Sequence, residues 1–131
     1  MNRPLLAAIL LGGLTSLIHL LAGGQDVAAP LLAAPLAPAP KFTLYAVWHM
    51  ATLSLLASVA GWIYCLYRPA GAVLGIFLGA LWCGFGLVFL AVSAAFPEYG
   101  LFWQLPQWLL LLPCGLLALW GLRRPSRGKT A

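Results

Sequence analysis

The sequence predicts an all-α protein: a four-helix transmembrane bundle with both termini cytoplasmic (N-in/C-in), short loops and one Pro-rich outer loop. Three observations predict this fold. Of the 131 residues, 63% are hydrophobic and only 7% are charged, whereas a soluble domain carries about 25% charged residues. Four apolar runs approach or exceed the roughly 20 residues that cross a hydrocarbon core. The basic residues gather on one side of the resulting topology.

The apolar runs place the predicted spans at residues 5–23, 42–67, 70–96 and 101–122. Little sequence remains outside them, so residues 1–131 are expected to form a single integral membrane domain. If both termini are cytoplasmic, the outer side holds only Lys41 among the basic residues. The inner side then holds Arg3, Arg68, Arg123, Arg124, Arg127 and Lys129. This bias follows the positive-inside rule and predicts a bacterial-type inner-membrane protein whose basic tail, residues 123–131, contacts anionic lipid.

The first span and the loop after it leave two alternatives open. Small residues at Ala22-Gly23-Gly24 offer a signal-peptide cleavage site, but the apolar run is longer than the 7–15 residues of a signal-peptide core. The outer loop at residues 24–41 contains four prolines, a density that argues against a continuous helix. Because this loop is also apolar, we expect it to lie at the membrane interface or to cap the bundle mouth.

The third span carries a stripe of small residues that predicts close helix packing. Gly71, Gly75 and Gly79 recur at four-residue spacing, which places them on one helix face and lets another helix approach closely in lipid. The sequence leaves open whether the partner is the first span, the fourth span or a second copy of the chain.

The fourth span contains Pro106 and Pro113, and each proline removes a backbone donor from a helix. We therefore expect either a kinked span or a start delayed to Pro106, with the preceding residues along the interface. The tryptophans near the span ends, such as Trp48, Trp103 and Trp108, are typical of an aromatic belt and receive no ligand role.

Several function classes are disfavoured by what the sequence contains. The net charge of +5 comes from basic residues scattered at helix ends, not from a basic groove, so no nucleic-acid partner is expected. No nucleotide-binding, zinc-protease or nucleophile-elbow motif is present, and we expect no enzymatic activity. The thiols of Cys65, Cys83 and Cys114 fall within predicted spans and are interpreted as buried structural groups.

The two histidines are the most informative residues. His19 lies near the outer end of the first span and His49 near the outer start of the second, so the topology places them at similar depth. Thr15 shares a predicted helix face with His19, and Tyr45 and Thr52 share one with His49. We expect both histidines to point into the bundle, with Asp26 and Glu98 available at its mouth; these candidate ligand or proton-site residues are His19, His49, Thr15, Tyr45, Thr52, Asp26 and Glu98.

Three interpretations of the histidines remain open. They can be interhelical hydrogen-bond partners, which contribute about 0.6–2 kcal/mol in membranes. They can ligate a transition metal or a haem, or bind a quinone, although the sequence requires no cofactor. They can also carry protons in transport or sensing, because a histidine changes its charge near physiological pH.

The function that the sequence predicts is a non-enzymatic accessory or small-ligand-binding membrane component with an outer-side His19/His49 pocket. The alternatives are a small transporter subunit that oligomerises through the glycine stripe, and a metal- or haem-binding membrane protein. The expected partners are the lipid bilayer and, if the chain assembles, further copies of itself or a larger membrane complex.

Overall fold

The computed structural model describes residues 2–123, and within this range every regular element is a helix, as the sequence predicts. The long helices are α1 (Arg3–Gly23), α3 (Pro38–Tyr67), α4 (Ala72–Ala95) and α6 (Trp108–Arg123). The short elements are a π-helical turn (Gly24–Ala28), α2 (Ala29–Ala33), α5 (Leu101–Gln104) and 3-10 turns at Pro69–Gly71 and Pro97–Tyr99. Most of the predicted basic tail, residues 124–131, lies outside the described residues.

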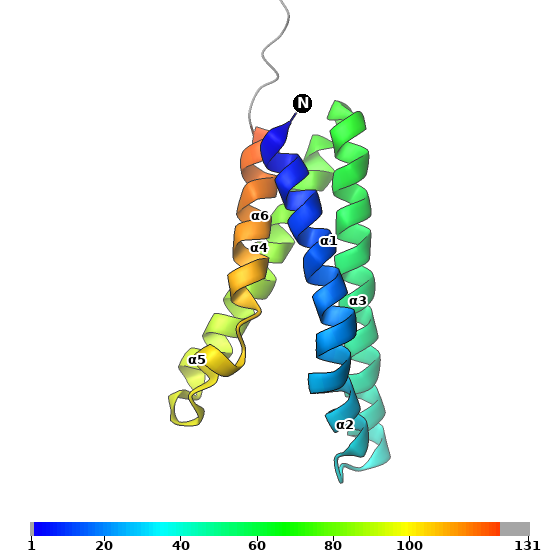
Figure 1. The fold of residues 1–131 in the computed structure, drawn as a ribbon, viewed down its shortest axis with the longest axis vertical. Coiled ribbons are helices and arrows are strands. Elements are labelled where there is room, and N and C mark those ends of the chain that lie inside the picture. The colour runs from blue at the N-terminus through cyan, green and yellow to red at the C-terminus, as the bar shows by residue number, and fades with distance from the viewer. Residues whose placement is uncertain (1, 124–131) are drawn as a thin grey trace, which may run out of the picture.

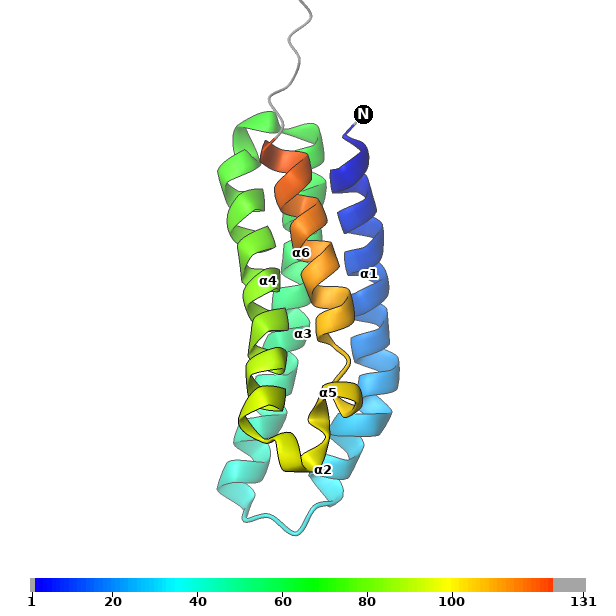
Figure 2. The same cartoon turned by 90° about the vertical axis from the view of Figure 1, so that its left-hand side faces the viewer.

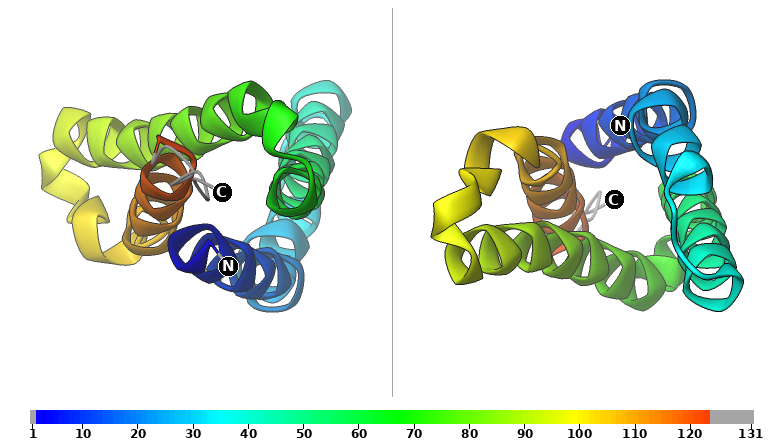
Figure 3. Two further views of the ribbon diagram at one scale, coloured as in Figure 1. Left: turned by 90° about the horizontal axis from the view of Figure 1, so that it is seen from above. Right: turned by 90° about the horizontal axis from the view of Figure 1, so that it is seen from below.

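The long helices form two pairs that converge at one end of the molecule and diverge toward the other (Figure 1). One pair is α1 and α3, and the other is α4 and α6 (Figure 1); the most extensive contacts are those of α6 with α4 and with α1. α6 also packs against α1, and α3 against α4, so that the helices surround a common interior (Figures 2 and 3). We call the convergent end, with Arg3, Arg68 and Arg123, the arginine end. The hairpin end is the opposite one, with the loop at residues 34–37 (Figure 1).

The first and last described helices are tied together at the arginine end. The Asn2 side chain caps α1, because its Oδ1 accepts a hydrogen bond from the Leu5 amide at 3.2 Å. The same side chain donates through Nδ2 to the Gly121 carbonyl of α6 at 2.7 Å. One amide thus fixes the start of α1 against the end of α6.

A core of leucines, small residues and two tryptophans joins the two pairs. Its buried members are Leu5, Ala8, Leu55, Trp62, Cys65, Trp82, Leu111, Cys114 and Ala118. Trp62 and Trp82 are both fully buried, with ring centroids 5.1 Å apart. Trp62 Nε1 donates to the Gly75 carbonyl at 3.1 Å, which links α3 to α4. A buried indole N–H is costly without a partner, so this bond stabilises the contact.

The glycine stripe of α4 packs mainly within the chain. A Cβ on Gly75 would lie 2.5 Å from Leu122 of α6, and one on Gly79 would lie 3.1 Å from the Gly115 carbonyl. Gly71, at the start of the stripe, faces Tyr64. Close approach of α4 and α6 therefore depends on glycines on both helices, and α6 occupies the face that a second copy of the chain would need.

The three thiols are free and belong to this packing. Cys114 donates through Sγ to the Ala8 carbonyl at 3.2 Å, and Cys65 to the Gly71 carbonyl at 3.1 Å. Cys83 is partly buried, and its Sγ would lie 2.6 Å from a Cβ on Gly115.

Three helical segments are long and apolar enough to cross a membrane: Arg3–Ala33, Pro38–Tyr67 and Ala72–Ala95. The fourth apolar helix, α6, has 16 residues and is shorter than the predicted span at residues 101–122. Leu101–Gln104 instead forms the separate α5, and α6 begins only after Pro106. The structure thus has the delayed start, with Pro113 accommodated inside α6.

The Pro-rich segment contains more helix than the sequence predicts, although residues 34–37 interrupt it and no continuous helix crosses it, as expected. The π-helical turn carries α1 into α2, and only residues 34–37 are outside a helix between α1 and α3. The reason is the position of each proline. Pro38 and Pro40 lie in the first turn of α3, where a helix needs no backbone N–H. Pro30 instead directly follows the π-helical turn, in which the Ala29 amide donates to the Gly24 carbonyl, five residues earlier.

Candidate functional site

The contact between α1 and α3 in the hairpin half of the molecule is built around His19 and Trp48. Their rings stack, with centroids 3.8 Å apart and an interplanar angle of 19°. Gly23, four residues after His19, makes room for the indole, because a Cβ there would lie 2.5 Å from Trp48 Cη2. The Trp48 side chain therefore lies across α1, against both His19 and Gly23.

Thr52 fixes the orientation of the His19 ring. His19 Nε2 lies 3.0 Å from Thr52 Oγ1. The Thr52 hydroxyl donates its single hydrogen to the Trp48 carbonyl at 3.1 Å, which leaves its oxygen lone pairs to accept. The arrangement suits a His19 tautomer that carries its hydrogen on Nε2 and donates to Thr52.

His49 does not face the interior of the molecule. The expectation that both histidines point into the bundle is therefore wrong for His49. Its side chain is exposed, whereas that of His19 is partly buried. His49 instead lies against Tyr45, one turn earlier on α3, with ring centroids 4.6 Å apart in an edge-to-face arrangement. Within residues 2–123 no hydrogen-bond partner of the His49 ring is observed.

The other predicted site residues, Thr15, Asp26 and Glu98, make no contact with the His19 ring among the interactions of the described residues. Thr15 is buried, and its hydroxyl donates to the Leu11 carbonyl of its own helix at 2.8 Å. Asp26 is exposed in the π-helical turn, and Glu98 is exposed in the turn that follows α4. The carboxylates therefore belong to different halves of the diverging hairpin end (Figure 1).

The arrangement suits hydrogen bonding and stacking better than metal binding. Among the residues that the structure describes, no group of three or more His, Cys, Asp or Glu side chains is placed to hold a metal ion. The cluster formed by His19, Trp48 and Thr52, with His49 and Tyr45 beside it, offers aromatic faces and imidazole nitrogens. These groups recognise planar or hydrogen-bonding parts of a ligand.

The contact between Trp48 and Gly23 was not identified from the sequence. Trp48 was interpreted as part of an aromatic belt, and Gly23 as a residue on the helix face of His19 and as part of a cleavage site. The signal was their helical spacing: Gly23 follows His19 by four residues, and Trp48 precedes Thr52 by four. Side chains at this spacing are neighbours on one helix face. The structure brings the His19 face of α1 against the Trp48 face of α3.

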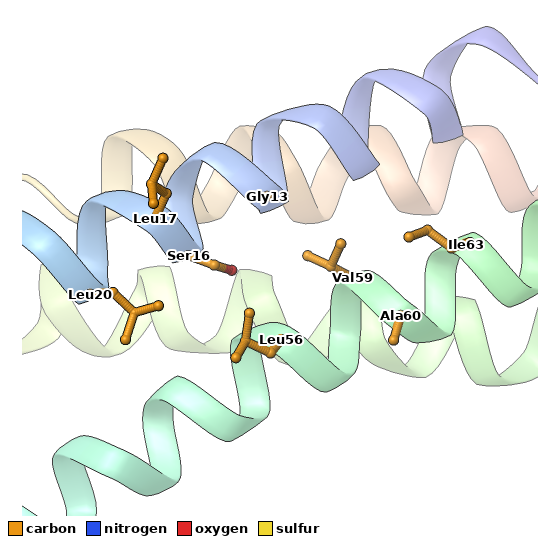
Figure 4. A pocket seen from close by; sticks show the side chains of 8 residues that line it. All are labelled: Gly13, Ser16, Leu17, Leu20, Leu56, Val59, Ala60 and Ile63. Atoms are coloured by element: carbon orange, nitrogen blue, oxygen red, sulfur yellow. The ribbon is translucent and has the colours of Figure 1, made fainter.

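An open apolar groove of about 320 Å³ runs along the α1–α3 contact. Its lining residues are Gly13, Ser16, Leu17, Leu20, Leu56, Val59, Ala60 and Ile63 (Figure 4). The Ser16 hydroxyl donates to the Gly12 carbonyl at 2.8 Å, so its hydrogen is already used within α1. The groove therefore presents an almost entirely apolar surface.

No protein-family model, curated protein or solved structure matches this chain.

Proposed function

We propose that the protein is a non-enzymatic, small-ligand-binding component of a bacterial-type inner membrane. It crosses the bilayer with α1, α3, α4 and α6, and its arginine end faces the cytoplasm. At 1.5 Å per residue α6 spans about 24 Å, most of a hydrocarbon core of about 30 Å. The positive-inside rule supports the orientation, because Arg3, Arg68 and Arg123 lie at one end.

The observation that carries the binding proposal is the pairing of a fixed imidazole with an exposed one. His19 is held by Trp48 and Thr52, whereas His49, next to Trp48 in the chain, is exposed beside Tyr45. A polar group that faces lipid without a partner is unfavourable. A ligand that hydrogen-bonds to His49 removes this cost, and the aromatic rings provide a flat surface beside it.

The depth of His49 supports this interpretation. Arg68 follows His49 by nineteen residues, which separates them by about 28 Å along α3. With Arg68 at the cytoplasmic boundary, His49 lies close to the opposite boundary of the hydrocarbon core. This boundary is accessible both to the polar parts of membrane-embedded ligands and to small solutes from the aqueous phase on that side.

The experiment is to identify what co-purifies with the protein. Wild-type protein in mild detergent is compared with the His19→Ala/His49→Ala double variant by visible absorption, metal analysis and mass spectrometry of the organic extract. Met50→Leu is the matched control, because Met50 is an exposed neighbour of His49 on the same helix. We expect a near-stoichiometric ligand in the wild type and the control, reduced at least fivefold in the double variant.

The outcomes separate the possible roles of the site. A Soret band or a stoichiometric metal lost in the double variant would identify a cofactor as the ligand. Equal ligand content in all three proteins, or none in any of them, would contradict the proposal and leave His19 as a helix-packing group.

A further inference from the structure

We infer that the groove between α1 and α3 binds one acyl chain of a phospholipid whose polar head lies against His49. This inference rests on the proposed function and names the ligand class of that site. Figure 4 shows the groove, with Leu17 and Leu20 of α1 and Leu56, Val59 and Ile63 of α3 along its walls.

His49 lies on the same face of α3 as the groove. His49, Leu56 and Ile63 follow one another at seven-residue intervals, a spacing that returns nearly to the same side of a helix. Leu56 and Ile63 line the groove, so His49 marks its continuation toward the hairpin end. An apolar groove that leads to an exposed imidazole matches the order of tail and head in a lipid.

The dimensions of the groove fit an acyl chain that enters from the bilayer leaflet at the hairpin end. Leu56 follows His49 by seven residues, or about 10 Å along α3. One leaflet of the hydrocarbon core is about 15 Å deep, so a chain whose head lies beside His49 reaches the groove before the bilayer midplane. The phosphate or ester oxygens then lie at the level of the His49 ring, where they can accept its N–H.

A slender occupant fits the groove better than a second copy of the chain. The groove is lined by eight residues, whereas a stable protein interface uses about 20–30 residues on each side. The glycine stripe of α4, the face best suited to helix association, already packs against α6. The Ser16 hydroxyl donates within α1 and leaves little for a polar ligand to bind in the groove itself.

The inference is tested by filling the groove. A Cβ on Gly13 would meet nothing within 4 Å, so Gly13→Leu places a side chain in the groove without forcing the backbone apart. The matched control is Gly84→Leu on α4, where a Cβ also meets nothing within 4 Å. Ala60→Phe fills the groove from α3 and replaces Gly13→Leu if that variant fails to fold.

The probe is a phosphatidylglycerol that carries a diazirine near the end of one acyl chain, added to the full-length protein in detergent and photolysed. We expect cross-links at Leu17, Leu56 or Val59, reduced at least fivefold in Gly13→Leu and in His49→Ala. Gly84→Leu should cross-link as the wild type does.

The other outcomes overturn the inference in distinguishable ways. Unchanged cross-linking in Gly13→Leu shows that the groove holds no acyl chain, while loss of the co-purified ligand in the histidine variants would still support the proposed function. Cross-linking lost in Gly13→Leu but unchanged in His49→Ala refutes the contact between the lipid head and His49. A dimer that Gly13→Leu converts to monomer, without change in lipid cross-linking, identifies a second copy as the occupant.

Discussion

The contact between α4 and α6 and the contact between α1 and α3 are built on different principles. α4 and α6 meet through glycines, with the Gly79 and Gly115 backbones close together. The hairpin half of the α1–α3 contact instead uses the imidazole of His19, the indole of Trp48 and the hydroxyl of Thr52. The difference indicates that the first contact maintains the fold, whereas the second contains the polar and aromatic groups on which the proposed function depends.

The largest stability effect is expected for Gly115→Ala. A Cβ there would lie 2.6 Å from the Gly79 carbonyl and 2.9 Å from the Cys83 amide. These are backbone atoms that move only with their helices, so we expect the free energy of unfolding to fall by about 1–3 kcal/mol or more. Thermal unfolding in detergent, followed by circular dichroism, measures this.

Gly84→Ala is the control for that experiment, because its Cβ meets nothing within 4 Å. It should keep or slightly raise the unfolding temperature, since alanine favours a helix over glycine by about 1 kcal/mol. If both variants unfold at the same temperature, glycine contacts do not stabilise the α4–α6 pair.

A smaller effect, confined to the hairpin half, is expected for Gly23→Ala. The new Cβ would lie 2.5 Å from the Trp48 ring, which can move as a side chain, so the stability loss should stay near 1 kcal/mol. The stacking on His19 should be disturbed, and near-ultraviolet circular dichroism should change. Gly24→Ala, with open space around its Cβ, should leave the spectrum unchanged; an equal change in both would refute the Trp48–Gly23 contact.

Thr52→Val should cost less, because it removes one interhelical hydrogen bond. Such bonds contribute about 0.6 kcal/mol in membrane proteins, with a maximum near 1.7 kcal/mol. The double-mutant cycle with His19→Ala isolates the interaction. Ser54→Ala, whose hydroxyl donates within α3 to the Met50 carbonyl, is the control and should show no coupling to His19. A coupling energy near zero for Thr52 would mean that the His19–Thr52 bond does not form.

The smallest stability effect is expected for His49→Ala. Its side chain is exposed, and surface substitutions change stability by less than about 0.5 kcal/mol. His19→Ala, which removes the stacking partner of Trp48, should cost more. A larger loss in His49→Ala than in His19→Ala, measured by thermal unfolding of ligand-free protein, would reverse the roles assigned to the two histidines.

The helical character of the molecule was predictable from run length and composition, and the close packing of α4 from its glycines. The partner of that glycine stripe was not, because small residues on one helix permit a close approach without specifying which helix makes it. Gly115 became informative only when α6 was placed beside Gly79. The helical parts of the Pro-rich segment were not predicted, because proline density was counted without regard to where a helix begins, which decides whether Pro38 and Pro40 disturb it.

The candidate site shows a similar limit. The sequence indicated that His19 and Thr52 could share a contact between neighbouring helices, and the structure places them 3.0 Å apart. The sequence did not show that His49 and Thr52 point in different directions. Residues three apart are assigned to one helix face, although their directions differ by about 60°. Here that angle separates a buried hydroxyl from an exposed imidazole.

The central claim is that His49 binds a ligand without contributing to the fold. Its most direct test is the thermal unfolding of delipidated wild-type protein and His49→Ala, before and after addition of a total membrane lipid extract. Binding to the native state stabilises it by about 2.7 kcal/mol at a free ligand concentration of 100 times Kd. The account predicts equal unfolding temperatures without the extract and a rise of several degrees on its addition in the wild type alone. Equal rises in both proteins, or a lower starting temperature for His49→Ala with no difference in response, would contradict it.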